Sequence, residues 1–177
     1  MRTFVLAASL VAAGAFGAAG SLIAEETGNS CPGRVIANWK VDGVSYPAST
    51  AMAMRTGDAW QLTLVECRDD GADRALQFAG LPAPLAVGRY ALTVRILHGS
   101  RPQGAAGASF SATGGGTISS DTNYFTDATH TGTLEVTRVD AIAKTFDATF
   151  SFTAVNDAGT GVVEITAGKI TAARSPG

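Results

Sequence analysis

The sequence predicts an all-β fold, an antiparallel β-sandwich or alternatively a flattened barrel of about nine to ten strands. The first observation behind this prediction is that apolar residues recur at every second position and not at the helical period. The second is that turn residues separate the apolar runs at intervals of about 10–14 residues, as in sandwiches and barrels. The third is that helical patterns are nearly absent after the first two dozen residues.

The chain opens with MRTFVLAASLVAAGAFGAAGSLIA, which has the layout of a secretory signal peptide. Arg2 supplies a positive start, residues 4–16 form an apolar core too short to span a bilayer comfortably, and small residues follow. We expect a signal peptide over residues 1–24, cut somewhere between residues 19 and 24. The alternative is an uncleaved membrane anchor, which the Gly and Ala content of the run disfavours.

The remaining chain divides into a lead over residues 25–34 and a single β-sandwich domain over residues 35–174. Cys31 lies well past the apolar run, whereas a lipid-attachment cysteine would follow that run directly. We therefore expect an exported bacterial protein, periplasmic or extracellular and open to surface association, with no transmembrane segment once the signal is removed.

Cys31 and Cys67 are the two cysteines of the chain. In an oxidising compartment they are expected to form a structural disulfide, worth roughly 3–4 kcal/mol in the chain-entropy model. The alternative is a redox or metal-binding pair, but neither a CxxC spacing nor a neighbouring histidine supports it.

The charge balance argues against nucleic-acid binding. The chain has 13 Lys and Arg, one of them Arg2 in the expected signal, against 15 Asp and Glu, so the mature protein has a net charge of about −3. No basic stripe or Lys/Arg cluster is visible, and nucleic-acid binding draws its affinity from neutralised phosphates.

The clearest strand is TFDATFSFTA, residues 145–154, in which every second residue is apolar. A helix would scatter the four polar residues between them around its circumference, whereas a strand places them on one face and the phenylalanines on the other. We expect this strand to be half buried, with its Phe ladder on the core. The same alternation predicts strands at WQLTLVEC (60–67), YALTVRIL (90–97), GTLEVTRV (132–139) and VVEITAGKIT (162–171).

The segments between these strands give further predictions. Asp42–Gly43 predicts a two-residue hairpin, and Gly168 predicts a bulge or break in the last strand. RTGDA, RDDGAD and NDAGTG are looser turns, and residues 80–88 are a Pro-containing connection. Residues 98–132, rich in Gly, Ser, Thr and Ala, are expected to hold two short polar strands, around Ala108–Thr113 and Thr117–Phe125.

The C-terminal third, TGTLEVTRVDAIAKTFDATFSFTAVNDAGTGVVEITAGKITA, resembles the closing segment of a family of secreted bacterial domains of unknown function, many of them lipoprotein-like. The resemblance is loose over residues 35–173 and best over 131–171. The chain departs from the family pattern at Asp147 and Ile170, and it lacks the lipid-attachment cysteine. The resemblance implies a β-sandwich without a known activity, and it carries over no functional residues.

Oxygen-rich loops make calcium a candidate ligand of this chain. Asp121, Asn123 and Asp127 are the best candidate ligands, with RDDGAD as a second cluster. Neither segment has the EF-hand spacing, and the alternative is that these carboxylates form turns. No cofactor is expected apart from this calcium. Too few histidines and free cysteines converge for a zinc or copper site.

Aromatic residues suggest a candidate ligand-binding surface. Trp39, Tyr46 and Tyr124 are candidates for a platform that binds a glycan through ring faces and polar rims. Trp39 and Tyr46 flank the predicted hairpin, so the alternative is ordinary cross-strand packing. Trp60 is expected in the core.

No residues specify catalysis. A triad could be assembled from Ser109 with His98 or His130, but GASFSA lacks the closing Gly of a nucleophile elbow. Glu66, Glu135 and Glu164 are expected on polar strand faces, with nothing to place two of them across a cleft. The sequence therefore favours a non-enzymatic extracytoplasmic module for binding or surface assembly, whose partner is a surface protein or a glycan. The alternatives are a carrier of a glycan or apolar molecule and, less favoured, an enzyme with an unrecognised site.

Overall fold

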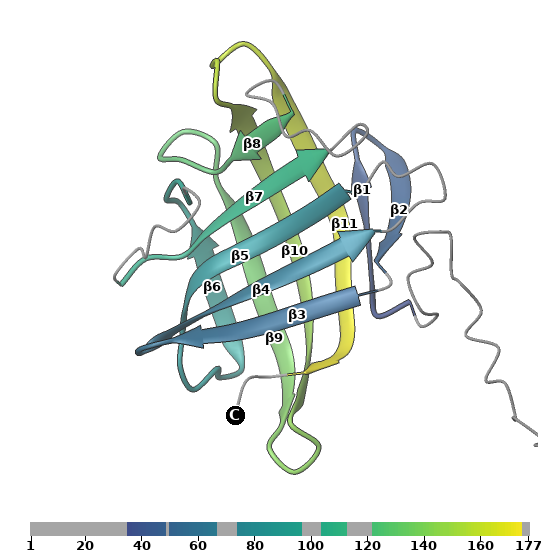
Figure 1. Cartoon of the computed structure of the whole chain (residues 1–177), viewed down its shortest axis with the longest axis vertical. Coiled ribbons are helices and arrows are strands. Elements are labelled where there is room, and N and C mark those ends of the chain that lie inside the picture. Colours follow the sequence, from purple (N-terminus) through teal and green to yellow (C-terminus); the bar gives the residue numbers. More distant parts are fainter. Residues whose placement is uncertain (1–34, 49, 67–73, 97–103, 113–121, 175–177) are drawn as a thin grey trace, which may run out of the picture.

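The computed structural model describes residues 35–48, 50–66, 74–96, 104–112 and 122–174, and within these ranges the chain is all-β and antiparallel (Figure 1). The described part has eleven strands, against about nine to ten expected. The strands are β1 (Ala37–Val41), β2 (Val44–Ala48), β3 (Thr50–Thr56), β4 (Ala59–Glu66), β5 (Arg74–Pro82), β6 (Gly88–Leu92), β7 (Gly107–Ala112), β8 (Asn123–Phe125), β9 (Gly132–Asp140), β10 (Thr145–Asn156) and β11 (Val162–Arg174).

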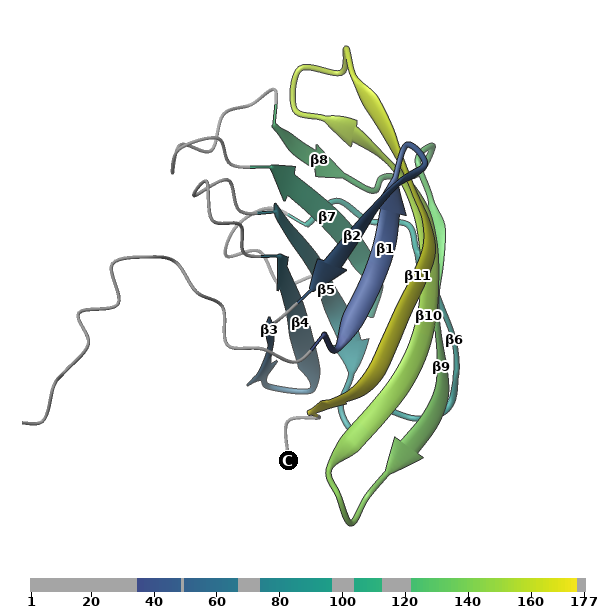
Figure 2. The same cartoon turned by 90° about the vertical axis from the view of Figure 1, so that its right-hand side faces the viewer.

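The strands form one folded-over sheet with two layers that face each other across the core (Figure 2). One layer has the order β2-β1-β11-β10-β9-β6, and the other has the order β8-β7-β5-β4-β3. The sheet is nearly closed and barrel-like. The predicted all-β class, a sandwich or a flattened barrel, is confirmed. No helix in the part of the chain that the structure describes has the length and apolarity of a membrane span.

Strand β10 joins the two layers. Residues 145–152 pair with β9 in the first layer, and Val155 and Asn156 pair with β8, which leads into the second. A second connection is the isolated bridge between Leu92 and Ala106, next to β6 and β7. The layers are thus hydrogen-bonded to each other at two places.

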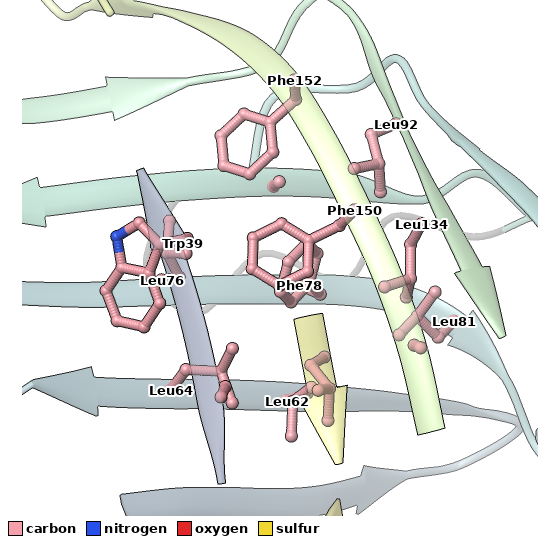
Figure 3. Packing of buried hydrophobic residues seen from close by; sticks show 14 of the residues in the cluster. Trp39, Leu62, Leu64, Leu76, Phe78, Leu81, Leu92, Leu134, Phe150 and Phe152 are labelled. Carbon is pink, nitrogen blue, oxygen red and sulfur yellow. The ribbon is translucent and has the colours of Figure 1, made fainter. Parts of the chain in front are cut away.

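The core lies between the layers and is built on aromatic contacts between them (Figure 3). The predicted Phe ladder of β10 is confirmed, with Phe146, Phe150 and Phe152 all buried. Phe78 of the opposite layer packs edge-on against Phe150 and Phe152, with ring centroids 5.0 and 6.1 Å apart. Trp60, also buried as predicted, makes the same kind of contact with Phe146 at 5.4 Å.

Each of the two buried tryptophans leaves a polar indole nitrogen without a partner in the part of the chain that the structure describes, which costs free energy. The indole Nε1 atoms of Trp39 and Trp60 have no hydrogen-bond partner among the described residues. A buried donor without a partner costs about 1–3 kcal/mol. The burial of two large apolar rings offsets this cost.

Two local predictions are confirmed. Asp42 and Gly43 have φ values of 49° and 84°, the two positive values that a type I′ hairpin turn needs, and they join β1 to β2. The pairing of β10 with β11 shifts register beside Gly168, where Ala167 has a φ of 49°. This is the bulge that Gly168 predicts.

Two other predictions are wrong in part. The predicted strand over 90–97 ends at Leu92, because the N–H groups of both Thr93 and Val94 donate to the single carbonyl of Ala106, which breaks regular pairing. Glu66 does not lie on a polar face, since it shares the inward face of β4 with Leu64 and has only 7% of its surface exposed. Its burial is possible because Nη1 of Arg74 lies 3.0 Å from its carboxylate.

Candidate functional site

The predicted aromatic platform does not form. Trp39 and Tyr46 are direct partners across β1 and β2, as the hairpin implies. Trp39, however, is 1% exposed and packs in the core, so its ring offers no face to a ligand. Tyr124 lies on β8, and its ring packs against Phe110 and makes no ring contact with Trp39 or Tyr46 in the described part of the chain.

Tyr46 instead belongs to a stacked ion pair. The guanidinium carbon of Arg74 lies 4.1 Å from the centre of the Tyr46 ring, and the same guanidinium binds Glu66. The ring face is therefore already occupied by a cation from the same chain. Tyr46, Arg74 and Glu66 thus connect β2 to β5 and β4. The half-buried position of Tyr46 is accounted for by this packing and needs no ligand.

The calcium candidates lie only partly within the described residues, and the RDDGAD cluster lies outside them. Asp121 lies outside the described residues, as do Cys31 and Cys67 of the predicted disulfide. Asn123 is half-buried in β8. The side chain of Asp127 stabilises a turn, in which its Oδ1 accepts hydrogen bonds from the backbone N–H groups of Thr129 and His130 at 2.8 and 2.6 Å. The described residues contain no group of three or more His, Cys, Asp or Glu placed to hold a metal ion.

Asp127 also contacts the His130 ring, whose Nδ1 lies 3.1 Å from Oδ1. Hydrogen bonds from the His130 backbone N–H, then from Thr129 and from the ring, hold the pKa of Asp127 below its usual range, against a smaller opposing effect of burial. This contact is the nearest approach to catalytic geometry in the described residues. Its partners nevertheless lie within three positions along one exposed turn, the arrangement of a structural Asx turn.

We predict that Asp127 titrates below its ordinary pKa of about 3.8. Because the folded pKa is the lower one, the stabilisation is complete above the unfolded pKa and is lost as the pH falls through the folded pKa. Asp127→Asn keeps the acceptor oxygen but cannot titrate, so the stability difference between wild type and D127N is expected to vanish in acid. A carboxyl-detected NMR titration measures the pKa directly. A value at or above that of a free aspartate would contradict the turn geometry.

A polar groove of about 570 Å³ lies on the outer face of β6, β9, β10 and β11. Strand register places four of its side chains in one row across these strands: Lys169 opposite Thr149, Thr149 opposite Glu135, and Glu135 opposite Arg89. Neighbouring strands lie about 4.8 Å apart, so the row spans about 14 Å. The adjacent hydroxyls of Ser151 and Thr133 form a second row.

The bulge in β11 shapes one wall of this groove. Ala167, at its rim, has the left-handed backbone that a residue with a Cβ adopts at a cost of about 1–2 kcal/mol. The next residue, Gly168, faces the core, where a Cβ would lie 2.3 Å from the Phe150 ring. The bulge therefore turns Lys169 outward while the core keeps its Phe ladder.

A third feature is the edge formed by β3. This strand pairs with β4 through seven consecutive residues without a register shift, and with no other described strand. Met52 and Met54 on its outer face are 57% and 61% exposed. They are the two methionines of the chain besides Met1.

Sequence reasoning missed both the groove and the edge. The groove residues come from four strands that are far apart in sequence, and each one has the pattern of an ordinary solvent-facing position. The alternation of Ala and Met over residues 51–54 was the available signal for β3. Comparisons of the chain with protein-family models, with curated proteins and with solved structures give no match.

Proposed function

We propose that the protein is an exported, non-enzymatic module for binding and surface assembly, which associates through the open edge of β3. The observation that carries this proposal is the combination of a long, regular edge strand with two exposed methionines. Exposed edges offer unpaired N–H and C=O groups to another chain, and flexible methionines adapt to the surface that covers them.

The other two edges of the described sheet carry the features by which proteins block such pairing. Strand β2 is five residues long and contains Pro47, which cannot donate a backbone hydrogen bond. Strand β6 is also five residues long, and Arg89 on it forms an ion pair with Glu135. Strand β3 has no proline, no bulge and a single charge, Arg55, near its end.

The partner that fits this edge is a second copy of the chain. An antiparallel pairing of two β3 strands about a twofold axis at Ala53 sets Met52 opposite Met54 and Arg55 opposite Ala51. It brings all four methionines onto one face and sets no like charges opposite each other. The whole strand, residues 50–56, thus pairs with its own copy, with Thr50 opposite Thr56.

The test is the oligomeric state of the mature protein by sedimentation equilibrium over a wide range of concentration. We expect a concentration-dependent dimer, since a single strand edge is a small interface. In the double variant Met52→Lys/Met54→Lys like charges face each other across the axis, which is expected to weaken the dimer by at least about tenfold.

The matched control is Val44→Lys/Val162→Lys, which places the same charges at two residues that are each 56% exposed and lie outside β3. We expect it to dimerise as the wild type does. A wild type that stays monomeric, or equal dimerisation of both double variants, would overturn the proposal.

Several further parts of the proposal rest on sequence. Export to the periplasm or the cell exterior rests on the signal-like residues 1–24. Relationship to the secreted β-sandwich family rests on residues 131–171, which correspond to β9, β10 and most of β11. An enzyme is the least favoured alternative, because the His130–Asp127 contact is explained by its turn.

A further inference from the structure

The groove over β6, β9, β10 and β11 contains a set of polar groups that the chain itself leaves unused. The hydroxyls of Thr133, Thr149 and Ser151 and the ammonium of Lys169 have no side-chain hydrogen bond or ion pair within the described part of the chain. By contrast, Thr137 and Thr153 on the same two middle strands donate to backbone carbonyls. The unpartnered hydroxyls are therefore gathered in the groove.

Of the three charged side chains in the groove, two are paired with each other and one, Lys169, is not. Glu135 at the centre of the row is held by Nη2 of Arg89 at 3.1 Å, so this carboxylate is neutralised but keeps acceptor capacity. Lys169 lies at the other end of the row, two strands from Glu135. The free ammonium is the strongest unpaired donor in the groove, and it favours an anionic group on whatever binds there.

The lining also narrows the class of ligand. The one aromatic residue of the lining, Phe150, is 4% exposed, so the groove has no ring on which a nucleobase would stack. Hydroxyls that both donate and accept, beside a carboxylate that accepts, match a polyhydroxylated ligand.

We propose that this groove binds an anionic saccharide that lies across the strands, with its carboxylate or sulfate on Lys169. The sugar hydroxyls then exchange hydrogen bonds with Thr149, Ser151 and Thr133 and donate to Glu135. The row of about 14 Å provides room for an oligosaccharide of a few units. This site is on the opposite layer from β3 and does not depend on dimerisation.

The experiment is calorimetric titration of the mature protein with three short oligosaccharides of equal length: an oligogalacturonate, a sulfated oligosaccharide and a neutral one. We expect binding of at least one charged saccharide that weakens with added salt, and weaker binding of the neutral one. The charged saccharide that binds more tightly identifies carboxylate or sulfate as the preferred group. Failure of both charged saccharides, or equal binding of the neutral one, would overturn the proposal.

Lys169→Gln is expected to weaken the charged saccharide by at least about tenfold, because a charge-assisted hydrogen bond is lost. The matched control is Lys40→Gln, which removes an exposed lysine from β1 outside the groove lining. Thr149→Val removes a central hydroxyl and keeps the shape, and it is expected to weaken every saccharide that binds. Equal effects of K169Q and K40Q would contradict the placement of the anion.

The same titration separates this proposal from the assembly proposal. M52K/M54K is expected to bind the saccharide as the wild type does, and K169Q is expected to dimerise as the wild type does. Loss of saccharide binding in M52K/M54K would show that the groove is not the site.

Discussion

Replacing Phe78 with alanine is expected to lower the free energy of unfolding by about 3–5 kcal/mol. The ring is fully buried in β5 and contacts both Phe150 and Phe152 across the core. Without the ring, the protein loses the free energy gained by burying it and both edge-to-face contacts. The substitution also leaves a cavity, which the two closely packed sheet layers cannot close. A loss of this size is a large fraction of the stability of an ordinary domain.

Urea denaturation followed by tryptophan fluorescence measures this effect, since Trp60 lies in the same core. The control is Ile142→Ala, which shortens a side chain that is 97% exposed in the turn between β9 and β10 and should change stability by about 0.5 kcal/mol or less. If F78A does not fold, Phe78→Leu provides a smaller loss of the same origin. An F78A or F78L protein as stable as I142A would contradict the packing described here.

The second large effect is expected at Gly132, where β9 begins. A Cβ at this position would lie 2.1 Å from Cβ of Phe152 and 2.3 Å from the carbonyl oxygen of Ser151. Neither group can move without displacing the strand β10 that joins the two layers. Gly132→Ala is therefore expected to cost about 3 kcal/mol, the upper part of the range for overpacking.

Gly57→Ala separates this steric effect from backbone strain. Gly57 has open space around its missing Cβ but a φ of 62°, so its replacement is expected to cost about 1 kcal/mol through conformation alone. Both variants are measured by the same urea denaturation. A G132A protein no less stable than G57A would contradict the close approach of β9 and β10 at Gly132.

The parts of this fold that sequence predicts are those set by local chemistry. The Phe ladder of residues 145–154 follows from period two, the Asp42–Gly43 turn from residues that tolerate positive φ, and the bulge near Gly168 from a glycine inside a strand. Each of these needs only a few neighbouring residues to be recognised.

Strand order is set by contacts between distant residues and is not encoded in any short pattern. Nothing in residues 123–125 indicates that this three-residue strand lies between β10 and β7. The burial of Glu66 depends on Arg74, which lies eight residues further along the chain and on a different strand. The groove could not be predicted for the same reason, because Arg89, Glu135 and Lys169 become neighbours only through the register of the strands.

Strand β11 has a consequence for how the molecule matures. Its residues 162–174 lie between β1, from the beginning of the described chain, and β10. The hairpin of β1 and β2 joins the rest of the sheet through β11, so the native state cannot be completed during synthesis while residues 162–174 are still inside the ribosome. Until β11 has been made, β1 and the side of β10 that it covers keep unpaired backbone edges, so the unfinished chain is exposed to pairing with other chains until that strand takes its place.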